Sequence, residues 1–253
     1  MIEKCGVGCV QYALSDEVLV GNKVAIIQSN YIPWKGYFDI IAQVDEFILY
    51  DDVQYTRSDW RNRNLIKTPQ GLKWLTIPVK LKGRFGQRIC DTEASDSKWR
   101  RGHWSSLQQN YARAAFFERY AGRLERLYLH GSETLLSEIN RAFIELVCEL
   151  LGIRTRITWC MQYSIGADRQ HRLVELCQAV GGTAYLSGPA ARAYLDPQVF
   201  VRAGIALMYM DYSGYPVYPQ QHGAFEHGVT VLDLLFNAGP DARRCMKAFG
   251  GAA

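Results

Sequence analysis

The stretch from Val24 to Asn64 holds more hydrogen-bonding side chains than a buried core requires. Two short apolar runs within it predict buried strands, and the polar residues beside them indicate a binding site. We predict that Gln28 and Gln54 orient a substrate. The substrate-binding residues predicted in this stretch are Gln28, Tyr31, Tyr37, Gln54, Arg57, Arg61, Asn62, Arg63 and Asn64.

Asp51 and Asp52 directly follow the predicted strand 46–50. Ligands of open α/β sheets gather at the carboxyl ends of strands, so this pair is a candidate catalytic centre. Neighbouring strand residues point to opposite faces, and one of the two is therefore expected to face the site, as a base or as a metal ligand. A turn in which Asp binds local backbone amides is the alternative.

Basic residues dominate the segment from Gln54 to Arg88. It contains nine Lys or Arg and one acidic residue, Asp59, a balance of +8 in a chain whose formal net charge is +4. Arg61 and Arg63 share one face of an extended segment, and a guanidinium can donate two parallel hydrogen bonds to phosphate. We predict an anion site here, with a solvated basic surface as the alternative.

Two further groups complete the candidate site. His103, Ser106 and Asn110 fall on one face of a predicted helix, where His103 is placed to handle a proton and Asn110 to bind substrate. Polar residues also gather after the predicted strand 183–187, namely Ser187, Arg192, Tyr194 and Asp196. The alternatives are an exposed helix face for the first group, and a turn with Asp196 as a helix N-cap for the second.

Strands and helices are predicted to alternate along the chain. Strands are expected at 24–28, 46–50, 73–79, 155–159, 183–187 and 205–210, and helices after 33, within 98–151, at 168–180, after Asp196 and at 229–237. This pattern predicts an α/β fold with a mainly parallel sheet, analogous to Rossmann-like or nucleotidyltransferase-like folds. The loop 29–33 lacks the glycines of GxGxxG and of the P-loop, which argues against a standard dinucleotide or Walker-type site.

The expected organisation is an extension over residues 1–22, a single domain over 23–240 with a helical insert at 98–151, and a tail over 241–253. The chain has 253 residues with ordinary globular composition, 48% hydrophobic and 21% charged. No apolar run approaches the roughly 18 residues of a membrane span, and no signal-peptide pattern is present. Seven scattered cysteines fit reduced thiols, so we expect a cytoplasmic protein without a metal site.

Several blocks together resemble the WbqC-like family, often found among bacterial surface-polysaccharide genes. The blocks are Gln28 to Phe38, Tyr50-Asp-Asp-Val-Gln-Tyr55, Arg61-Asn-Arg-Asn64, His103 to Tyr111, Tyr185-Leu-Ser-Gly188, Tyr194-Leu-Asp196, Tyr218-Pro-Gln220 and Leu232 to Asn237. Ser29 departs from the proline that the family often carries there. The resemblance covers about residues 24 to 239 and implies a cytosolic enzyme that modifies an activated small molecule, such as a nucleotide-linked amino sugar.

Three functions remain open at this stage. The first is a transferase that places an acyl or aminoacyl group on the amine of a phosphorylated or nucleotide-linked small molecule, with an acyl donor or carrier protein as partner. The second is a single-stranded nucleic-acid-binding module, favoured by aromatic residues within the basic segment. The modest whole-chain charge and the lack of a basic recognition helix argue against nucleic acid. The third is a non-catalytic scaffold of a biosynthetic complex. The residue pattern names no cofactor.

Overall fold

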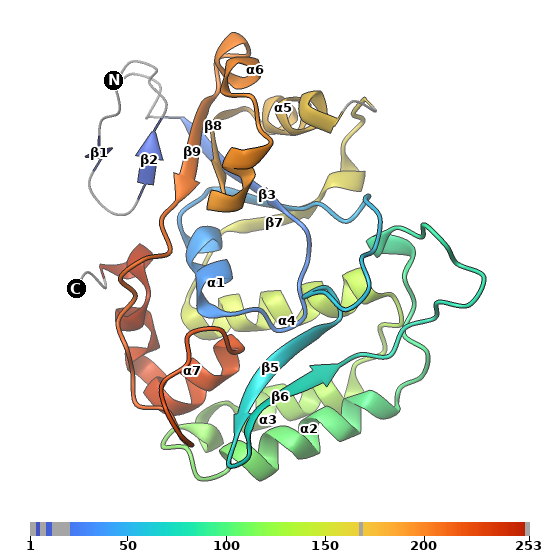
Figure 1. Ribbon diagram of the computed structural model, residues 1–253, viewed down its shortest axis with the longest axis vertical. Helices are drawn as coiled ribbons and strands as arrows, with labels where there is room; N and C mark the ends of the chain where they lie inside the picture. The colour runs from blue at the N-terminus through green and yellow to red at the C-terminus, as the bar shows by residue number, and fades with distance from the viewer. Residues whose placement is uncertain (1–3, 6–8, 12–20, 167–168, 251–253) are drawn as a thin grey trace.

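A seven-stranded sheet organises the fold, with strand order β1-β2-β9-β8-β3-β4-β7 (Figure 1). The computed structural model describes residues 4–5, 9–11, 21–166 and 169–250. Five neighbouring strands run parallel, which confirms the predicted α/β fold with a mainly parallel sheet. They are β3 (Asn22–Ile27), β4 (Glu46–Leu49), β7 (Arg156–Trp159), β8 (Gly182–Ser187) and β9 (Ala206–Met210).

The chain builds this sheet outward from β3 in two directions. From β3 it adds β4 and then β7 on one side, and it later returns to the other side of β3 to add β8 and then β9. The direction of winding therefore reverses between β3 and β8. In doubly wound sheets the loops on either side of such a point diverge and leave a crevice at the carboxyl ends of the strands.

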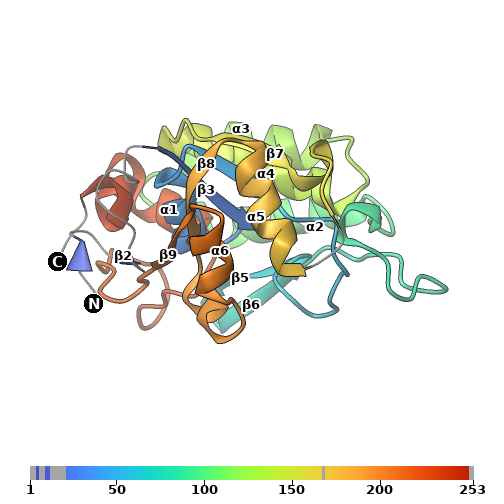
Figure 2. The same cartoon turned by 90° about the horizontal axis from the view of Figure 1, so that it is seen from above.

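Helices cover both faces of the sheet because each strand alternates its apolar side chains between two cores. Ala25, Phe47 and Leu186 pack on the side of α1 (Lys35–Ala42), α4 (Leu136–Leu151) and α7 (Val231–Ala238). Val24, Ile48 and Leu207 pack on the other side, with α5 (Arg169–Ala179) and α6 (Pro197–Arg202). Figure 1 shows α5 above and α4 below the strands β3 and β7, and in Figure 2, which views the molecule from above, α5 lies in front.

An insertion between β4 and β7 carries a hairpin and three helices. The predicted helical insert at 98–151 comprises α2 (Lys98–Tyr111), α3 (Phe117–His130) and α4. The strand expected at 73–79 is present as β6 (Gly71–Thr76), but it pairs antiparallel with β5 (Arg63–Thr68) outside the main sheet. A tight turn at Gly71, whose φ is +107°, lets these two segments pair locally.

Segments near both ends of the chain join the same fold. Within the predicted extension, β1 (Lys4–Cys5) pairs with β2 (Cys9–Gln11), which pairs antiparallel with β9. The part of the predicted tail that is described, up to residue 250, buries Met246 completely. Its backbone amides at Lys247 and Ala248 donate to the carboxylate of Asp39 in α1.

Across the described ranges, every helix is too short or too polar to cross a membrane.

Candidate functional site

A cavity of about 810 Å³ opens at the carboxyl ends of β3, β4 and β8. Its aromatic lining consists of Trp34, Tyr37, Tyr50, Trp60, Tyr185, Tyr194 and Tyr212. Its hydrogen-bonding lining consists of Gln28, Asn30, Gln54, Arg61, Arg172 and Ser187. The volume lies within the roughly 300–1,000 Å³ typical of small-molecule sites, and the position is the reversal point between β3 and β8.

The fold explains why these distant segments meet. A helix that connects two parallel strands runs back along them, so its first turn lies beside the carboxyl end of the strand before it. Trp34 and Tyr37 accordingly reach the cavity from the start of α1, and Arg172 from the first turn of α5. The Tyr37 hydroxyl donates to the Gln28 carbonyl at 3.0 Å, which joins that helix to the end of β3.

Arg61 is held in the cavity wall by contacts from three elements. Asn140 of α4 donates to the Arg61 carbonyl at 2.9 Å, and the Trp60 carbonyl accepts from the Tyr31 amide at 3.0 Å. The guanidinium donates to Asn30 and lies 3.6 Å from the carboxylate of Asp59. These contacts fix the backbone of the 60–61 segment and leave the guanidinium at the cavity surface.

Arg172 and Asp52 form an ion pair beside the cavity. Arg172 Nη2 donates to Asp52 Oδ2 at 2.8 Å, and Arg88 Nη1 donates to Asp52 Oδ1 at 2.6 Å. The Arg172 guanidinium also lies 5.4 Å from the ring centroid of Tyr50. Its Nε atom is buried without a hydrogen-bond partner in the described part of the chain. Asp52 therefore positions a cavity arginine through direct hydrogen bonds.

Asp51 points away from the cavity into a buried cluster. It accepts from the Ser29 amide at 2.8 Å and from the Ser137 hydroxyl, and Asn140 donates to the Ser29 hydroxyl at 3.0 Å. Burial raises the pKa of Asp51, although these hydrogen bonds oppose the shift. The pair thus splits between two faces, as neighbouring residues of an extended segment do, and Asp51 joins the β3 end to α4.

His103 lies in a buried aromatic cluster outside the cavity lining. Its Nδ1 is 2.9 Å from the Tyr31 hydroxyl, which is 2.7 Å from the Tyr128 hydroxyl. Trp99 packs edge-on against the His103 ring at 5.3 Å between centroids. Burial lowers the pKa of His103 to about 4, outweighing a hydrogen bond to the Thr76 backbone. The structure does not bring this ring together with the residues that line the cavity.

The remaining predicted site residues divide between the cavity and other contacts. Gln28, Tyr37, Gln54, Arg61, Ser187 and Tyr194 line it. Asn62 and Asn64 are buried. Asn62 donates to the Ile77 carbonyl, and Asn64 donates to the carbonyls of Tyr31 and Ile32.

Four other predicted residues lie outside the lining. The guanidinium carbon of Arg63 lies 4.1 Å from the ring centroid of Trp74, and that of Arg192 lies 4.8 Å from the ring centroid of Tyr209. Asn110 donates to the Ser106 carbonyl. Arg57 is exposed.

Asp196 caps α6, because its carboxylate accepts from the Gln198 amide at 2.9 Å. This is the N-cap role that the sequence left open as the alternative to substrate binding.

Acidic residues outside the basic segment neutralise much of its charge in space. Lys80 and Arg84 pair with Glu93, and Arg88 pairs with Asp52 and Asp91. Lys67 is buried and donates to Gln220 and to the Ala224 carbonyl. The excess of +8 counted along the chain is therefore partly neutralised in space. Of the basic residues in this segment, Arg61 lines the cavity.

Neither metal ligation nor thiol chemistry is favoured by the side chains described. No group of three or more His, Cys, Asp or Glu with metal-binding proximity occurs among the described residues. Burial raises the pKa of Cys90 to about 11 and those of Cys148 and Cys177 to about 12. Thiols of this kind stay protonated near neutral pH and are poor nucleophiles.

The sequence interpretation missed most of the aromatic lining and Arg172. Trp34, Tyr50 and Trp60 flank residues that were singled out, and Tyr212 follows β9 by two positions. Arg172 carried one usable signal, since it falls in the first turn of a helix that follows a parallel strand. That placement puts a side chain at the carboxyl edge of the sheet.

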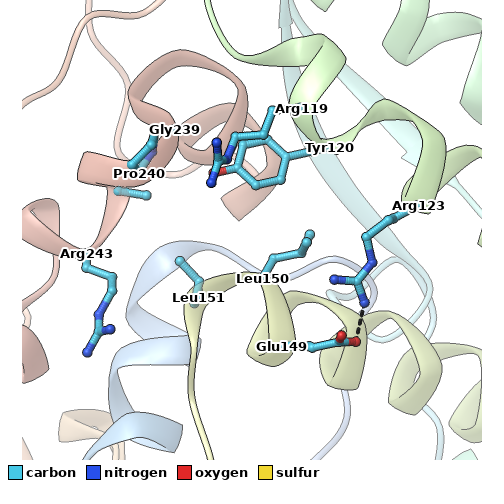
Figure 3. A pocket seen from close by; sticks show the side chains of 10 residues that line it. Arg119, Tyr120, Arg123, Glu149, Leu150, Leu151, Gly239, Pro240 and Arg243 are labelled. Atoms are coloured by element: carbon cyan, nitrogen blue, oxygen red, sulfur yellow. Dashed lines mark hydrogen bonds and ion pairs between the residues drawn. The ribbon is translucent and has the colours of Figure 1, made fainter.

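A second depression, of about 350 Å³, lies between α3, α4 and the segment after α7 (Figure 3). Arg119, Arg123 and Arg243 surround it, and Arg123 pairs with Glu149 at one side of it. All three arginines are exposed. Exposed charges of this kind are largely screened by solvent, so we place the candidate site at the sheet edge.

Comparisons with known proteins show the family of this chain. The model of the WbqC-like protein family matches residues 28–245. A relative from Mycobacterium tuberculosis (strain ATCC 25618 / H37Rv), described as "Uncharacterized protein Rv1507c", is 50% identical over 220 residues, which are 87% of this chain and 95% of the relative. No solved structure matches. The chain therefore belongs to the WbqC-like protein family.

Proposed function

We propose that the protein is a biosynthetic transferase that places an acyl or aminoacyl group on the amine of a phosphorylated or nucleotide-linked small molecule. The observation that carries the proposal is the sheet-edge cavity, which combines two arginines with an aromatic lining at the reversal point between β3 and β8. Arginine forks suit phosphate oxygens, and aromatic rings suit a base or the apolar face of a sugar.

Each group of lining residues has a distinct role in this proposal. Arg61 and Arg172 bind the phosphate oxygens, and Asp52 keeps Arg172 oriented. Gln28, Asn30 and Gln54 offer amide groups to the sugar hydroxyls. Asp51 and His103, both predicted from the sequence as catalytic, maintain the walls through their buried hydrogen bonds.

The paired charges argue against the nucleic-acid alternative. A protein that tracks a phosphate backbone needs a run of accessible cations. Here Lys67 is buried, and Lys80, Arg84 and Arg88 are paired with carboxylates. One cavity with two arginines fits one phosphorylated small molecule better.

A binding titration tests the first half of the proposal. Calorimetric titration with UDP, dTDP and ADP should detect at least one ligand, and Arg172→Gln should weaken that ligand about 10- to 100-fold. A hydrogen bond to a charged group contributes roughly 1.5–3 kcal/mol, which corresponds to that range. Arg126→Gln is the matched control, because Arg126 is an exposed arginine on α3.

A transfer assay tests the second half. UDP-glucosamine and acetyl-CoA are incubated with the protein, and mass spectrometry follows the gain of one acetyl group on the amino sugar. A parallel reaction uses glycyl adenylate as the aminoacyl donor and follows the gain of one glycyl group. Asp52→Asn should lower turnover far more than stability, because it weakens the hold on Arg172. Failure of all three nucleotides to bind, or equal loss in the Arg126 control, contradicts the proposal.

A further inference from the structure

A smaller cavity of about 300 Å³ adjoins the large one. Asn30, Trp34 and Trp60 line both cavities, so these three residues form the shared wall. The remaining lining of the small cavity consists of Pro33, Asn64, His227 and Gly228. Two adjoining cavities hold two substrates side by side, and a reaction between them requires that the reacting atoms meet within about 3–3.5 Å.

The chemistry of the small cavity differs from that of the large one. Among the residues that the structure describes, no Lys, Arg, Asp or Glu lines it, and its apolar lining consists of Pro33, Trp34 and Trp60. The amide of Asn64 is occupied by backbone groups, since it donates to Tyr31 and Ile32 and accepts from Leu65. The Asn30 carbonyl oxygen accepts from Arg61, and its amide nitrogen is a hydrogen-bond donor of this lining. Such a cavity suits a small neutral group bearing a carbonyl oxygen.

His227 is the titratable side chain of this lining. Its ring packs edge-on against Phe225 at 4.6 Å between centroids. Lys35 anchors the same loop by donating to the Pro216 carbonyl at 2.9 Å, and its ammonium lies 5.9 Å from the Phe225 centroid. The charged groups that act on the ring are Lys35 from α1 and Glu226 from its own loop.

His227 is an exposed residue, and its surroundings still favour a neutral ring. Burial and then Lys35 lower the pKa of His227, and the effect of Glu226 is opposite and smaller. A neutral imidazole near pH 7 is able to accept a proton.

We propose that the small cavity receives the acyl or aminoacyl group of the donor and that His227 accepts the proton of the attacking amine. This inference rests on the proposed transferase function and assigns its second subsite. The amine nitrogen of the substrate in the large cavity attacks the acyl carbon where the two cavities meet, beside Asn30, Trp34 and Trp60. A carbon–nitrogen bond forms, the bond from the acyl carbon to its leaving group breaks, and the proton passes from the amine to His227 and then to the leaving group.

Occupancy of the small cavity is tested without any reaction. Propionamide, a small neutral amide, is titrated into the protein while NMR follows the ring resonances of His227 and the indole resonances of Trp60. Both should shift in a saturable manner, whereas the ring of His130, exposed on α3, should not. Unshifted His227 resonances in a protein that binds a nucleotide would overturn the subsite and leave the proposed function standing.

The proton-accepting role is tested by His227→Gln, which keeps a polar side chain but cannot accept a proton in this pH range. It should lower kcat about 100-fold, within the usual range of a general base, with little change in the KM of UDP-glucosamine. The wild-type rate should fall on acidification as His227 becomes protonated, at a pH below the ordinary pKa of histidine, and this fall should vanish in the variant. His130→Gln should behave as wild type.

The outcomes separate the two proposals. A persistent acidic limb in His227→Gln overturns the role of His227 while transfer continues. Absence of transfer in the wild type overturns the proposed function and this role with it, and the propionamide titration still decides whether the small cavity binds a neutral carbonyl group.

Discussion

Two polar regions of this molecule have similar composition but different architecture. The sheet-edge cavity is lined by arginines, amides and tyrosines around a volume of about 810 Å³. The second region, which we call the closed network, consists of Lys67, Tyr111, Tyr218, Gln220 and Asp233. In the closed network Asp233 accepts from Tyr111, Tyr218 and Gln220, each at 2.9 Å, and Lys67 donates to Gln220 at 3.0 Å. Its polar groups bind one another, whereas those of the cavity face a volume large enough for a ligand.

The difference teaches how a dense group of polar residues is interpreted. Buried polar groups must find hydrogen-bond partners, so a fold with polar side chains in its interior builds networks that serve packing alone. Residue type does not separate such a network from a site. The separating observation is whether the side chains satisfy one another or line an open volume.

The largest effect on stability is expected at the centre of the closed network. Asp233→Ala removes the acceptor shared by two buried tyrosines and the partly buried Gln220, and should lower the free energy of unfolding by about 3–5 kcal/mol, since each hydrogen bond to a charged group contributes roughly 1.5–3 kcal/mol. Urea unfolding measures this loss. Nucleotide affinity of the remaining folded protein should not change, and a loss of affinity without a loss of stability would erase the distinction between the two regions.

The pH dependence of stability tests whether His103 is structural. Its pKa is about 4 in the folded protein and about 6.5 when unfolded, so the unfolded chain binds the extra proton between these values. Stability should therefore be full above about pH 6.5 and fall as the pH drops towards 4, by on the order of 3 kcal/mol. Urea unfolding at pH 7.5, 6 and 5 should show this slope in the wild type and a flatter one in His103→Gln.

Comparing nucleotide affinity after substitution of Arg61 and of Arg63 tests which of the two arginines belongs to the cavity. Arg61→Gln should weaken nucleotide binding about 10-fold or more, because Arg61 lines the cavity. Arg63→Gln should leave nucleotide affinity within about two-fold, because the Arg63 guanidinium stacks on Trp74. Calorimetric titration of both variants with the same nucleotide gives the comparison, and equal losses would place Arg63 in the site as well.

The smallest effect is expected at the rim of the cavity. The Tyr194 side chain is 56% exposed, so Tyr194→Ala should change the free energy of unfolding by less than about 0.5 kcal/mol. Affinity for the nucleotide should fall by a few-fold, since a stacked aromatic ring contributes about 0.5–1.5 kcal/mol. Tyr194→Phe should restore the affinity if stacking is the cause, and failure to do so points to the hydroxyl instead.

Local sequence patterns predicted the parallel strands well because their signal is short-range. Val24 to Gln28 and Ile205 to Met210 are apolar runs bounded by turn residues, and β3 and β9 lie there. Asp196-Pro197 predicted a helix start, and the Asp196 carboxylate caps α6. The strand around Trp74 was also predicted, but its pairing with β5 was not, because the residues of a strand do not specify which strand it pairs with.

The site was predictable only to the level of segments. Gln28 and Ser187 line the cavity and Asp51-Asp52 follows β4 at the same edge of the sheet, because parallel strands share that edge. Charge counted along the chain predicted one anion surface from 54 to 88, but the acids that neutralise it, Asp52, Asp91 and Glu93, lie outside that window. Ion pairs form in space, so a count along the sequence misses them.

The sequence by itself determined the fold class, the family and the segments that meet at the carboxyl edge. These depend on residue type and on spacing, both of which are read directly from the sequence. Tertiary structure decided which side chains face the cavity. Arg172 lines the cavity, whereas Arg63 packs on Trp74 of the hairpin. Asp52 accepts a hydrogen bond from Arg172, whereas Asp51 is buried and accepts from the Ser29 amide. The physical reason is that each polar group either finds a partner or meets open volume, and both depend on residues far away in the chain.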